Sequence, residues 1–216
     1  MNPFLIITLL ALQIQLCGTT QNSDIQTLKK TDMENKLDFD LLDKFARRTQ
    51  RRDSIGEFIH YSWVFTDESG TRVQLSGCTR RGIVVRETPP PPAFYRILRS
   101  YHPNGYLRRK GKQMGNGHTK IGVWEHFDES GLLIKTVDED KKFGKFGYNE
   151  VLLFLHQQGY INFETGEGRE RVSFGYNVET KRWWVSVVVS GWATDYIIDG
   201  ETGEVISREG PSIMEI

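Results

Sequence analysis

The segment Ser100–Leu107 (SYHPNGYL) is answered further along the chain by His126–Leu133 (HFDESGLL), with an aromatic residue, turn-forming residues, a glycine and a leucine in register. In each copy the Asn-Gly or Ser-Gly pair can supply the positive φ that a tight hairpin turn requires, and strand-forming residues flank it. We therefore predict two β-hairpins, with Gly105 and Gly131 in their turns.

Further glycines lie between the two copies, at Gly111, Gly115, Gly117 and Gly122-Val123-Trp124. The combined pattern, Y-x-x-N-G-x-L, G-x-x-x, G-x-W-x-x-F/Y, resembles the MORN-repeat variant of bacterial envelope proteins and of antitoxin-like proteins. The resemblance covers Phe94 to about Val137, and Trp63 with Asp67–Gly70 is interpreted as a decayed earlier copy. It implies an extended sheet surface that carries no chemistry of its own.

A different pattern begins near Phe143. Asn149 is the predicted cap of a helix over 150–158, and Gly159 follows where a left-handed residue closes a helix. Strands are predicted over 160–163, 171–178, 183–189, 195–198 and 204–207. The turn that joins the last two contains Gly200 and Gly203. We predict one helix packed on an antiparallel meander.

The chain's ending, W-x-V-x-V followed by Y-x-I-D-x-x-T-G-E-V-I, resembles PepSY-like domains. These are small exported α+β modules, some of which restrain proteases, and the resemblance covers residues 143–216. For the whole chain we predict an α+β fold that is mainly antiparallel β, with a hairpin-repeat sheet followed by a helix on an antiparallel meander.

The segment 1–17 carries no charge and is apolar from Phe4 to Leu12. We expect an export signal there, because a membrane-spanning helix needs roughly 20 apolar residues. The position of Cys17 resembles a bacterial lipoprotein signal, in which the cysteine is acylated. Cleavage near Gly18 and retention as an uncleaved anchor stay open. The expected location is the bacterial cell envelope, membrane-anchored and facing the periplasm, or otherwise secretion.

Composition changes divide the remainder of the chain. Residues 18–35 are polar and are expected to be a flexible tether. Helical spacing over 36–50, with acids before bases, predicts a helix, and short strands are predicted over 57–65, 71–75 and 82–86. The prolines at 89–92 mark a boundary or a stiff connector. The predicted domains are therefore 1–17, 18–35, 36–92, 93–142 and 143–216.

The charges balance, with 28 Lys plus Arg against 28 Asp plus Glu. No overall field therefore favours nucleic acid or a membrane surface. The expected partner is another protein or an envelope polymer, with membrane contact only through a lipid on Cys17 and no nucleic acid. If Cys17 carries that lipid, Cys78 has no cysteine left with which to close an intramolecular disulfide.

Alternation along the strand that begins at Trp183 separates two sets of side chains, because successive residues face opposite sides of a sheet. The set assigned to the core is Trp183, Val185, Val187 and Val189. The opposite set is Trp184, Ser186, Val188 and Ser190, with Trp192 added if the strand continues. Indole rings beside hydroxyls are typical of a half-wet surface, so Trp184, Ser186 and Trp192 are the predicted partner-binding residues. Burial of these rings under another element stays open.

No catalytic, cofactor or metal motif is found in the sequence. The five histidines lack H-E-x-x-H spacing, Asp138–Asp140 lacks the pattern of a calcium loop, and neither G-x-S-x-G nor G-x-x-x-x-G-K occurs. We therefore predict a non-enzymatic exported binding protein without cofactor or metal. The resemblance to antitoxin-like repeat proteins implies that it neutralises a toxin. The alternatives are restraint of a protease and an enzyme acting on envelope polymer, whose carboxylates would be distant in sequence.

Overall fold

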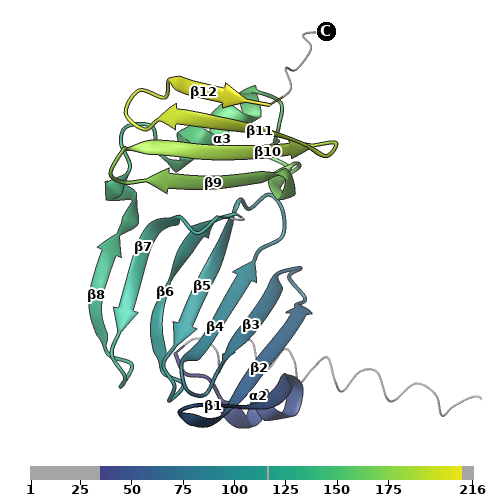
Figure 1. Ribbon diagram of the computed structural model, residues 1–216, viewed down its shortest axis with the longest axis vertical. Coiled ribbons are helices and arrows are strands. Elements are labelled where there is room, and N and C mark those ends of the chain that lie inside the picture. Colours follow the sequence, from purple (N-terminus) through teal and green to yellow (C-terminus); the bar gives the residue numbers. More distant parts are fainter. Residues whose placement is uncertain (1–34, 116, 211–216) are drawn as a thin grey trace, which may run out of the picture.

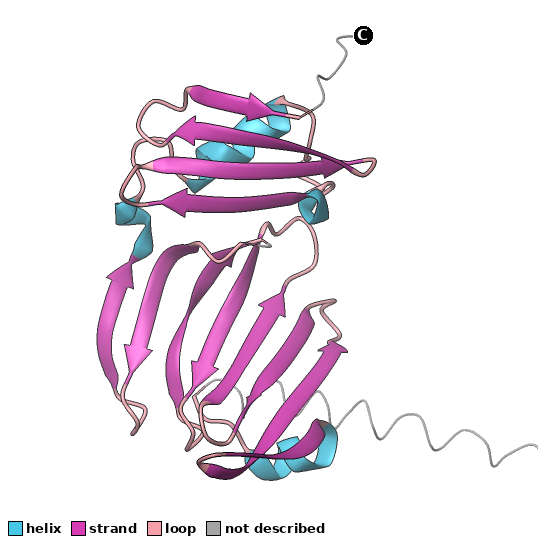
Figure 2. Cartoon of the chain, viewed as in Figure 1, coloured by secondary structure: helices cyan, strands magenta, loops and turns pink. Residues whose placement is uncertain are grey.

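The computed structural model describes residues 35–115 and 117–210. They form two antiparallel β-sheets with two α-helices and two short 3-10 helices (Figure 1). The predicted α+β class with mainly antiparallel strands is confirmed, as the strand-dominated cartoon shows (Figure 2). The expected export signal, the candidate lipidation site Cys17 and most of the expected tether lie outside the described residues.

The first sheet is an eight-stranded meander in which each strand pairs with the next along the chain. Its strands are β1 Arg47–Asp53, β2 Gly56–Thr66, β3 Arg72–Cys78, β4 Gly82–Thr88, β5 Tyr95–Tyr101, β6 Leu107–Met114, β7 Lys120–Phe127 and β8 Leu133–Asp138. The prolines at 89–92 connect β4 to β5, and these two strands are neighbours in the sheet, with Val84 opposite Ser100. Strands from both sides of the expected boundary at 92/93 thus belong to one sheet.

The two repeated segments form the turns of the β5–β6 and β7–β8 hairpins. Gly105 and Gly131 adopt φ values of +88° and +85°, a region that a β-branched residue rarely enters. In the second turn, Asp128 Oδ1 accepts a hydrogen bond from the backbone N–H four residues further on, at 3.0 Å. Asp67 does the same between β2 and β3, at 2.9 Å. The sequence repeat therefore corresponds to a repeated turn structure.

The helix predicted over 36–50 is wrong in its second half. Helix α2 spans only Phe39–Phe45, capped by Asp38, whose Oδ1 accepts from the N–H of Asp40 at 2.8 Å. The chain from Arg47 onward is strand β1, which pairs with β2 along its whole length. The order of the charges favours a helix. Pairing with β2 instead provides hydrogen-bond partners for the β1 backbone, and every β1 side chain stays exposed.

Helix α2 and the segment before it cover one face of the first sheet. Leu37 and Leu42 pack there on Tyr61, Leu75 and side chains of β4 to β6. The buried members of this cluster are Leu37, Leu42, Ala46, Tyr61, Val73, Leu75, Ile83, Val85, Tyr101 and Leu107. The covered face is thus the apolar set of an alternating pattern, as expected for a sheet with one packed side.

The second sheet is the predicted meander, with the helix on one of its faces. Helix α3 spans Tyr148–Gln157, and the strands are β9 Val172–Asn177, β10 Arg182–Val189, β11 Trp192–Asp199 and β12 Val205–Glu209. The 3-10 helices η1 (Glu139–Lys142) and η2 (Arg169–Arg171) lie on either side of α3 in the chain. The helix begins before Asn149, because the N–H of Gly147 donates to Glu150 Oε2 at 2.9 Å and Gly147 is the cap.

The strand predicted over 160–163 is wrong. Asn162 Oδ1 accepts hydrogen bonds from the backbone N–H groups of Glu164 and Thr165, at 2.9 and 3.2 Å, so the chain turns there. A single bridge between Asn162 and Glu167 is the only pairing described in this stretch. The aromatic and β-branched residues suggested a strand, whereas the Asn side chain decides for a turn.

One hydrophobic core joins the two sheets. It contains Val151 and Leu155 of α3, Trp183 of β10, Met114 of β6, and Phe94, which directly precedes β5. Tyr148 of α3 also donates from its hydroxyl to the Phe94 carbonyl at 2.9 Å. Residues on both sides of the expected boundary at 142/143 therefore contribute to the same core.

Candidate binding surface

The alternation predicted along β10 is present from 183 to 187. Trp183 and Val185 are fully buried, whereas Trp184 between them is 44 % exposed. Val189, assigned to the core set, is instead 41 % exposed and belongs to neither core cluster. It is the last residue of β10, where the β10–β11 hairpin extends beyond the rest of the sheet (Figure 1).

Trp183 is held by both packing and a hydrogen bond. Its indole Nε1 donates to the Phe146 carbonyl at 2.7 Å. Its ring centroid lies 4.8 Å from that of Phe143 and 4.7 Å from that of Tyr176. The N–H of the buried ring is thus satisfied, as a buried tryptophan requires.

Trp192 does not share a face with Trp184, so the predicted surface is not formed as a set of three. The strand does not continue past Val189, because Ser190 (φ +51°) and Gly191 (φ +84°) form a tight turn. Trp192 opens β11 directly opposite Val189. Opposite residues project on the same face, so Trp192 lies on the Trp183 side, 69 % exposed at the hairpin tip. The pair Ser190-Gly191, between two apolar runs, is the sequence pattern that predicts this turn.

The outer face of the second sheet, the side that α3 does not cover, is centred on Trp184. Gly175 of β9 and Ile197 of β11 flank Trp184, and a Cβ at Gly175 would lie 3.7 Å from the indole ring. A shallow hollow of about 490 Å³ lies at this place, next to Arg182. The absence of a side chain at Gly175 leaves room beside the ring.

A polar strip adjoins Trp184 on the same face. Ser186 lies between Ser173 and Asp195 in the sheet register. Asp195 Oδ1 is buried and has no hydrogen-bond partner within the described residues. The outer face thus combines an exposed indole, an apolar neighbour and an unsatisfied acceptor, which is the composition that a protein-binding surface uses.

The turn between β11 and β12 holds the other two predicted glycines. Gly203 has φ +77°, whereas Gly200 is required for close approach: a Cβ there would lie 2.6 Å from the Lys181 carbonyl oxygen. Hydrogen bonds from the backbone N–H of Thr202 and Glu201 lower the pKa of the Asp199 carboxyl below its usual range. These residues stabilise a turn and do not contribute to the outer face.

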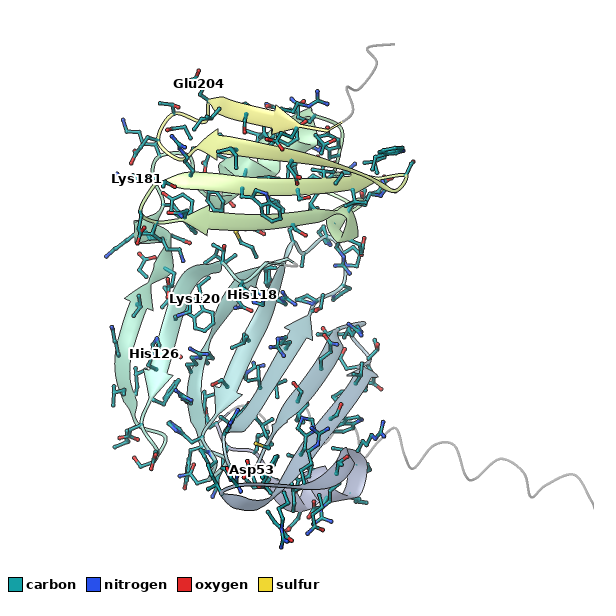
Figure 3. All side chains as sticks on the ribbon, viewed as in Figure 1. Asp53, His118, Lys120, His126, Lys181 and Glu204 are labelled. Atoms are coloured by element: carbon teal, nitrogen blue, oxygen red, sulfur yellow. The ribbon has the colours of Figure 1, made fainter. Side chains whose placement is uncertain are left out.

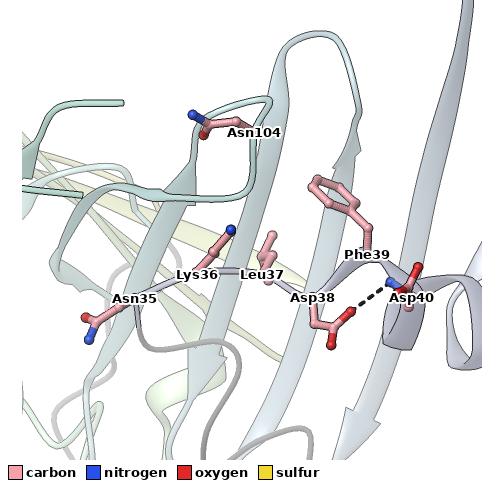
Figure 4. A pocket seen from close by; sticks show the side chains of 7 residues that line it. All are labelled: Asn35, Lys36, Leu37, Asp38, Phe39, Asp40 and Asn104. Carbon is pink, nitrogen blue, oxygen red and sulfur yellow. Dashed lines mark hydrogen bonds between the residues drawn. The ribbon is translucent and has the colours of Figure 1, made fainter. Parts of the chain in front are cut away.

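A second hollow, of about 550 Å³, lies at the start of α2 (Figure 4). Its polar groups already hold the local structure: Asp38 caps the helix, the N–H of Leu37 donates to Gly105 O at 2.8 Å, and Asn104 Nδ2 donates to Glu129 O at 2.8 Å. These groups fix the helix start and the β5–β6 turn, so the hollow does not provide a converging set of free ligands.

Two buried tyrosines and an exposed arginine link the chain after α3 to the second sheet. The hydroxyls of Tyr160 and Tyr196 are 2.8 Å apart, and Arg208 Nε donates to Tyr196 Oη at 3.1 Å. Burial, followed by the hydrogen bond to Tyr160, raises the pKa of the Tyr196 hydroxyl. A tyrosine that holds its proton more tightly in this way is suited to a structural hydrogen bond rather than to general base catalysis.

Metal and thiol chemistry have no assembled site in residues 35–115 and 117–210. No three His, Cys, Asp or Glu side chains in that part of the chain are placed to hold a metal ion. Cys78 is buried and forms no disulfide among these residues. None of the described helices is long and apolar enough to cross a membrane.

Comparison of the chain with protein-family models, with curated proteins and with solved structures found no match.

Proposed function

We propose that this chain is a non-enzymatic binding protein that docks a protein partner on the outer face of its second sheet. The observation that carries the proposal is the 44 % exposed ring of Trp184 beside Ile197, on a face that lies outside both core clusters. A large aromatic side chain is usually buried. Tryptophan is also among the residues that contribute most to protein interfaces.

The finer function that we propose is neutralisation of a toxin by a chain exported to the cell envelope and anchored through acylated Cys17. The hairpin repeats support this, since their sequence resembles antitoxin-like repeat proteins. Restraint of a protease is the second candidate, supported by the PepSY-like ending and by the helix-on-meander arrangement of residues 143–216. An enzyme acting on envelope polymer is the alternative from another class.

A photo-reactive residue introduced at Ser186 tests the surface while leaving the Trp184 ring in place. We expect irradiation of cells to yield a covalent adduct with one protein, and Trp184→Ala to abolish that adduct. The matched control carries the same photo-reactive residue at Leu153, which is 47 % exposed on α3. An adduct that survives Trp184→Ala, or that forms equally from position 153, would contradict the proposal.

The identity and behaviour of the captured protein then separate the candidate functions. If the partner is toxic when expressed alone and harmless with this chain, toxin neutralisation is supported. If it is a protease whose peptide cleavage slows when the purified chain is added, restraint is supported. Release of soluble fragments from envelope polymer by the purified chain alone would support the enzyme instead.

A further inference from the structure

The face of the first sheet opposite α2 presents basic side chains from five successive strands. We define this cationic face by Arg86 (β4), Arg96 (β5), Arg109 (β6), His126 (β7) and Lys135 (β8). Arg109 lies opposite His126, and His126 lies opposite Lys135. The sheet as a whole is shown with its side chains in Figure 3, where His126 is labelled.

The strand register places the other two arginines on the same face. Arg109 lies opposite Ser100, and Arg86 lies opposite Leu98. Arg96, Leu98 and Ser100 alternate along β5 and therefore share a side. Tyr101, of the opposite parity on β5, packs in the α2 cluster, so the cationic face is the side of the sheet that α2 leaves uncovered.

No acidic residue of the strands β4 to β8 lies on this face, and the acid beside it is Glu139 of η1, which pairs with Lys120 at 3.1 Å. The opposite face holds two ion pairs, Arg99 with Glu87 and Lys110 with Glu125 at 2.8 Å. Within the described residues, no ion pair involves any of the arginines or the lysine of the cationic face. The strand register therefore gathers these basic side chains on one face, although the chain has no excess of basic residues.

Two of these arginines have an unsatisfied donor, although Arg96 Nη2 donates to the Gly117 carbonyl at 2.9 Å. The Nε atoms of Arg96 and Arg109 are buried, and neither has a partner among the described residues. Burial, and then the charge of Arg86, lower the pKa of Arg96. Burial also lowers the pKa of His126, with further lowering by the charges of Lys120, Arg109 and Lys135 and an opposing contribution from Glu139. Cations without counter-ions at this depth are costly, and a ligand that supplies anionic oxygens would remove the cost.

The face is apolar only beneath its basic side chains. Leu98 and Trp124 lie on this side of the sheet and are 6 % and 1 % exposed, although neither belongs to a core cluster. Lys120 covers the Trp124 ring, with its Nζ 4.6 Å from the centroid. No exposed Trp, Tyr or Phe ring on β4 to β8 of this face therefore offers the stacking platform that single-stranded nucleic acid uses.

The size and chemistry of the face fit an extended chain of carboxylates. The three arginines lie on β4 to β6, about 10 Å across at about 4.8 Å per strand. Arg96 is four residues along β5 from the residue opposite Arg109, a distance of about 14 Å, and an extended peptide presents same-side residues about every 6.8 Å. Three acidic side chains at alternate positions thus fit within the face. Guanidinium groups match carboxylates as planar, two-pronged donors.

We propose that the cationic face binds an extended acidic polypeptide segment, whose alternating carboxylates pair with Arg86, Arg96 and Arg109. This surface lies on the first sheet and is independent of the Trp184 surface and of its proposed partner. The five strands contribute basic side chains and no acid to this face, so a basic segment would meet repulsion there.

Fluorescence anisotropy of the purified chain with a labelled peptide of alternating Glu and Ser tests this proposal. We expect saturable binding, none to the Lys-Ser counterpart, and a roughly tenfold or greater loss of affinity in Arg86→Gln/Arg96→Gln/Arg109→Gln. The control triple Arg48→Gln/Arg52→Gln/Arg81→Gln removes the same charge from exposed positions, and Arg48 and Arg52 lie on the α2 side of β1. We expect this control to bind within about twofold of the wild type.

Several outcomes would overturn the proposal. Equal loss in both triple variants would show attraction to overall charge, and no binding of the Glu-Ser peptide would show no site. Tighter binding of a single-stranded oligonucleotide or of phosphatidylserine vesicles, lost in the Arg86/Arg96/Arg109 variant, would assign the face to a different class of ligand. Thermal melts verify folding, and Arg86→Gln alone replaces the triple variant if that does not fold.

Discussion

Trp183→Ala should destabilise the protein far more than Trp184→Ala. Trp183 is fully buried, and truncation of a buried tryptophan costs about 3 to 5 kcal/mol. That range includes the Phe146 carbonyl left without its donor, a loss of about 1 kcal/mol. Trp184 is 44 % exposed, so its truncation removes only about half of a side-chain burial, or about 1 kcal/mol.

Urea denaturation followed by circular dichroism measures both free energies of unfolding. Trp183→Phe separates the two contributions to the larger loss, since it keeps an aromatic ring but removes the indole N–H that bonds to Phe146. We expect it to lie between wild type and Trp183→Ala. Equal losses for Trp183→Ala and Trp184→Ala, or greater acrylamide quenching of Trp183 than of Trp184 in single-tryptophan variants, would refute the assignment of faces.

Three further predictions concern the hairpin turns and the export signal. Gly105→Val and Gly131→Val should each cost roughly 1 kcal/mol or more, because a Cβ at either lies 2.9 Å from a neighbouring atom at positive φ; unchanged melting temperatures would contradict this. Hydrogen bonds from Ser130 and the Leu132 N–H lower the pKa of the Asp128 carboxyl in the folded protein. The ionised carboxyl therefore stabilises the fold at pH values above its ordinary pKa, and this contribution is lost as the pH falls through its pKa in the folded protein. The difference in free energy of unfolding between wild type and Asp128→Asn should accordingly become smaller in acid. Cys17→Ser should release the chain from membranes, and an intact mass starting at Gly18 would exclude acylation.

The hairpins could be predicted because their signals are local. An Asn-Gly or Ser-Gly pair at Gly105 and Gly131, between strand-forming residues, constrains the backbone within a few positions. The inward direction of Trp183 followed from alternation alone. These inferences needed no knowledge of which strand lies beside which.

The errors occurred where distant residues decide the structure. Arg47–Asp53 carries a charge order that suits a helix, yet β2 offers a strand partner along its whole length. Alternation alone assigns Trp192 to the face of Trp184, but the turn at Ser190 and Gly191 ends β10 and puts Trp192 on the opposite face. The basic side chains Arg86, Arg96 and Arg109 are scattered in the sequence, and only the register of β4 to β6 brings them to one face.

The core shared by the two sheets has a consequence for cooperativity. Phe94, directly before β5, and Met114 of β6 are almost fully buried in one cluster with residues of α3 and of the second sheet. A chain cut after Lys142 would leave these side chains in water and would deprive Trp183 of part of its packing. The first sheet also has its own cluster under α2, but the shared core couples it to the second sheet, so heat or urea should unfold both in one transition rather than in two steps. A substitution that destabilises the sheet of one proposed binding surface should therefore lower the free energy of unfolding of the other sheet as well.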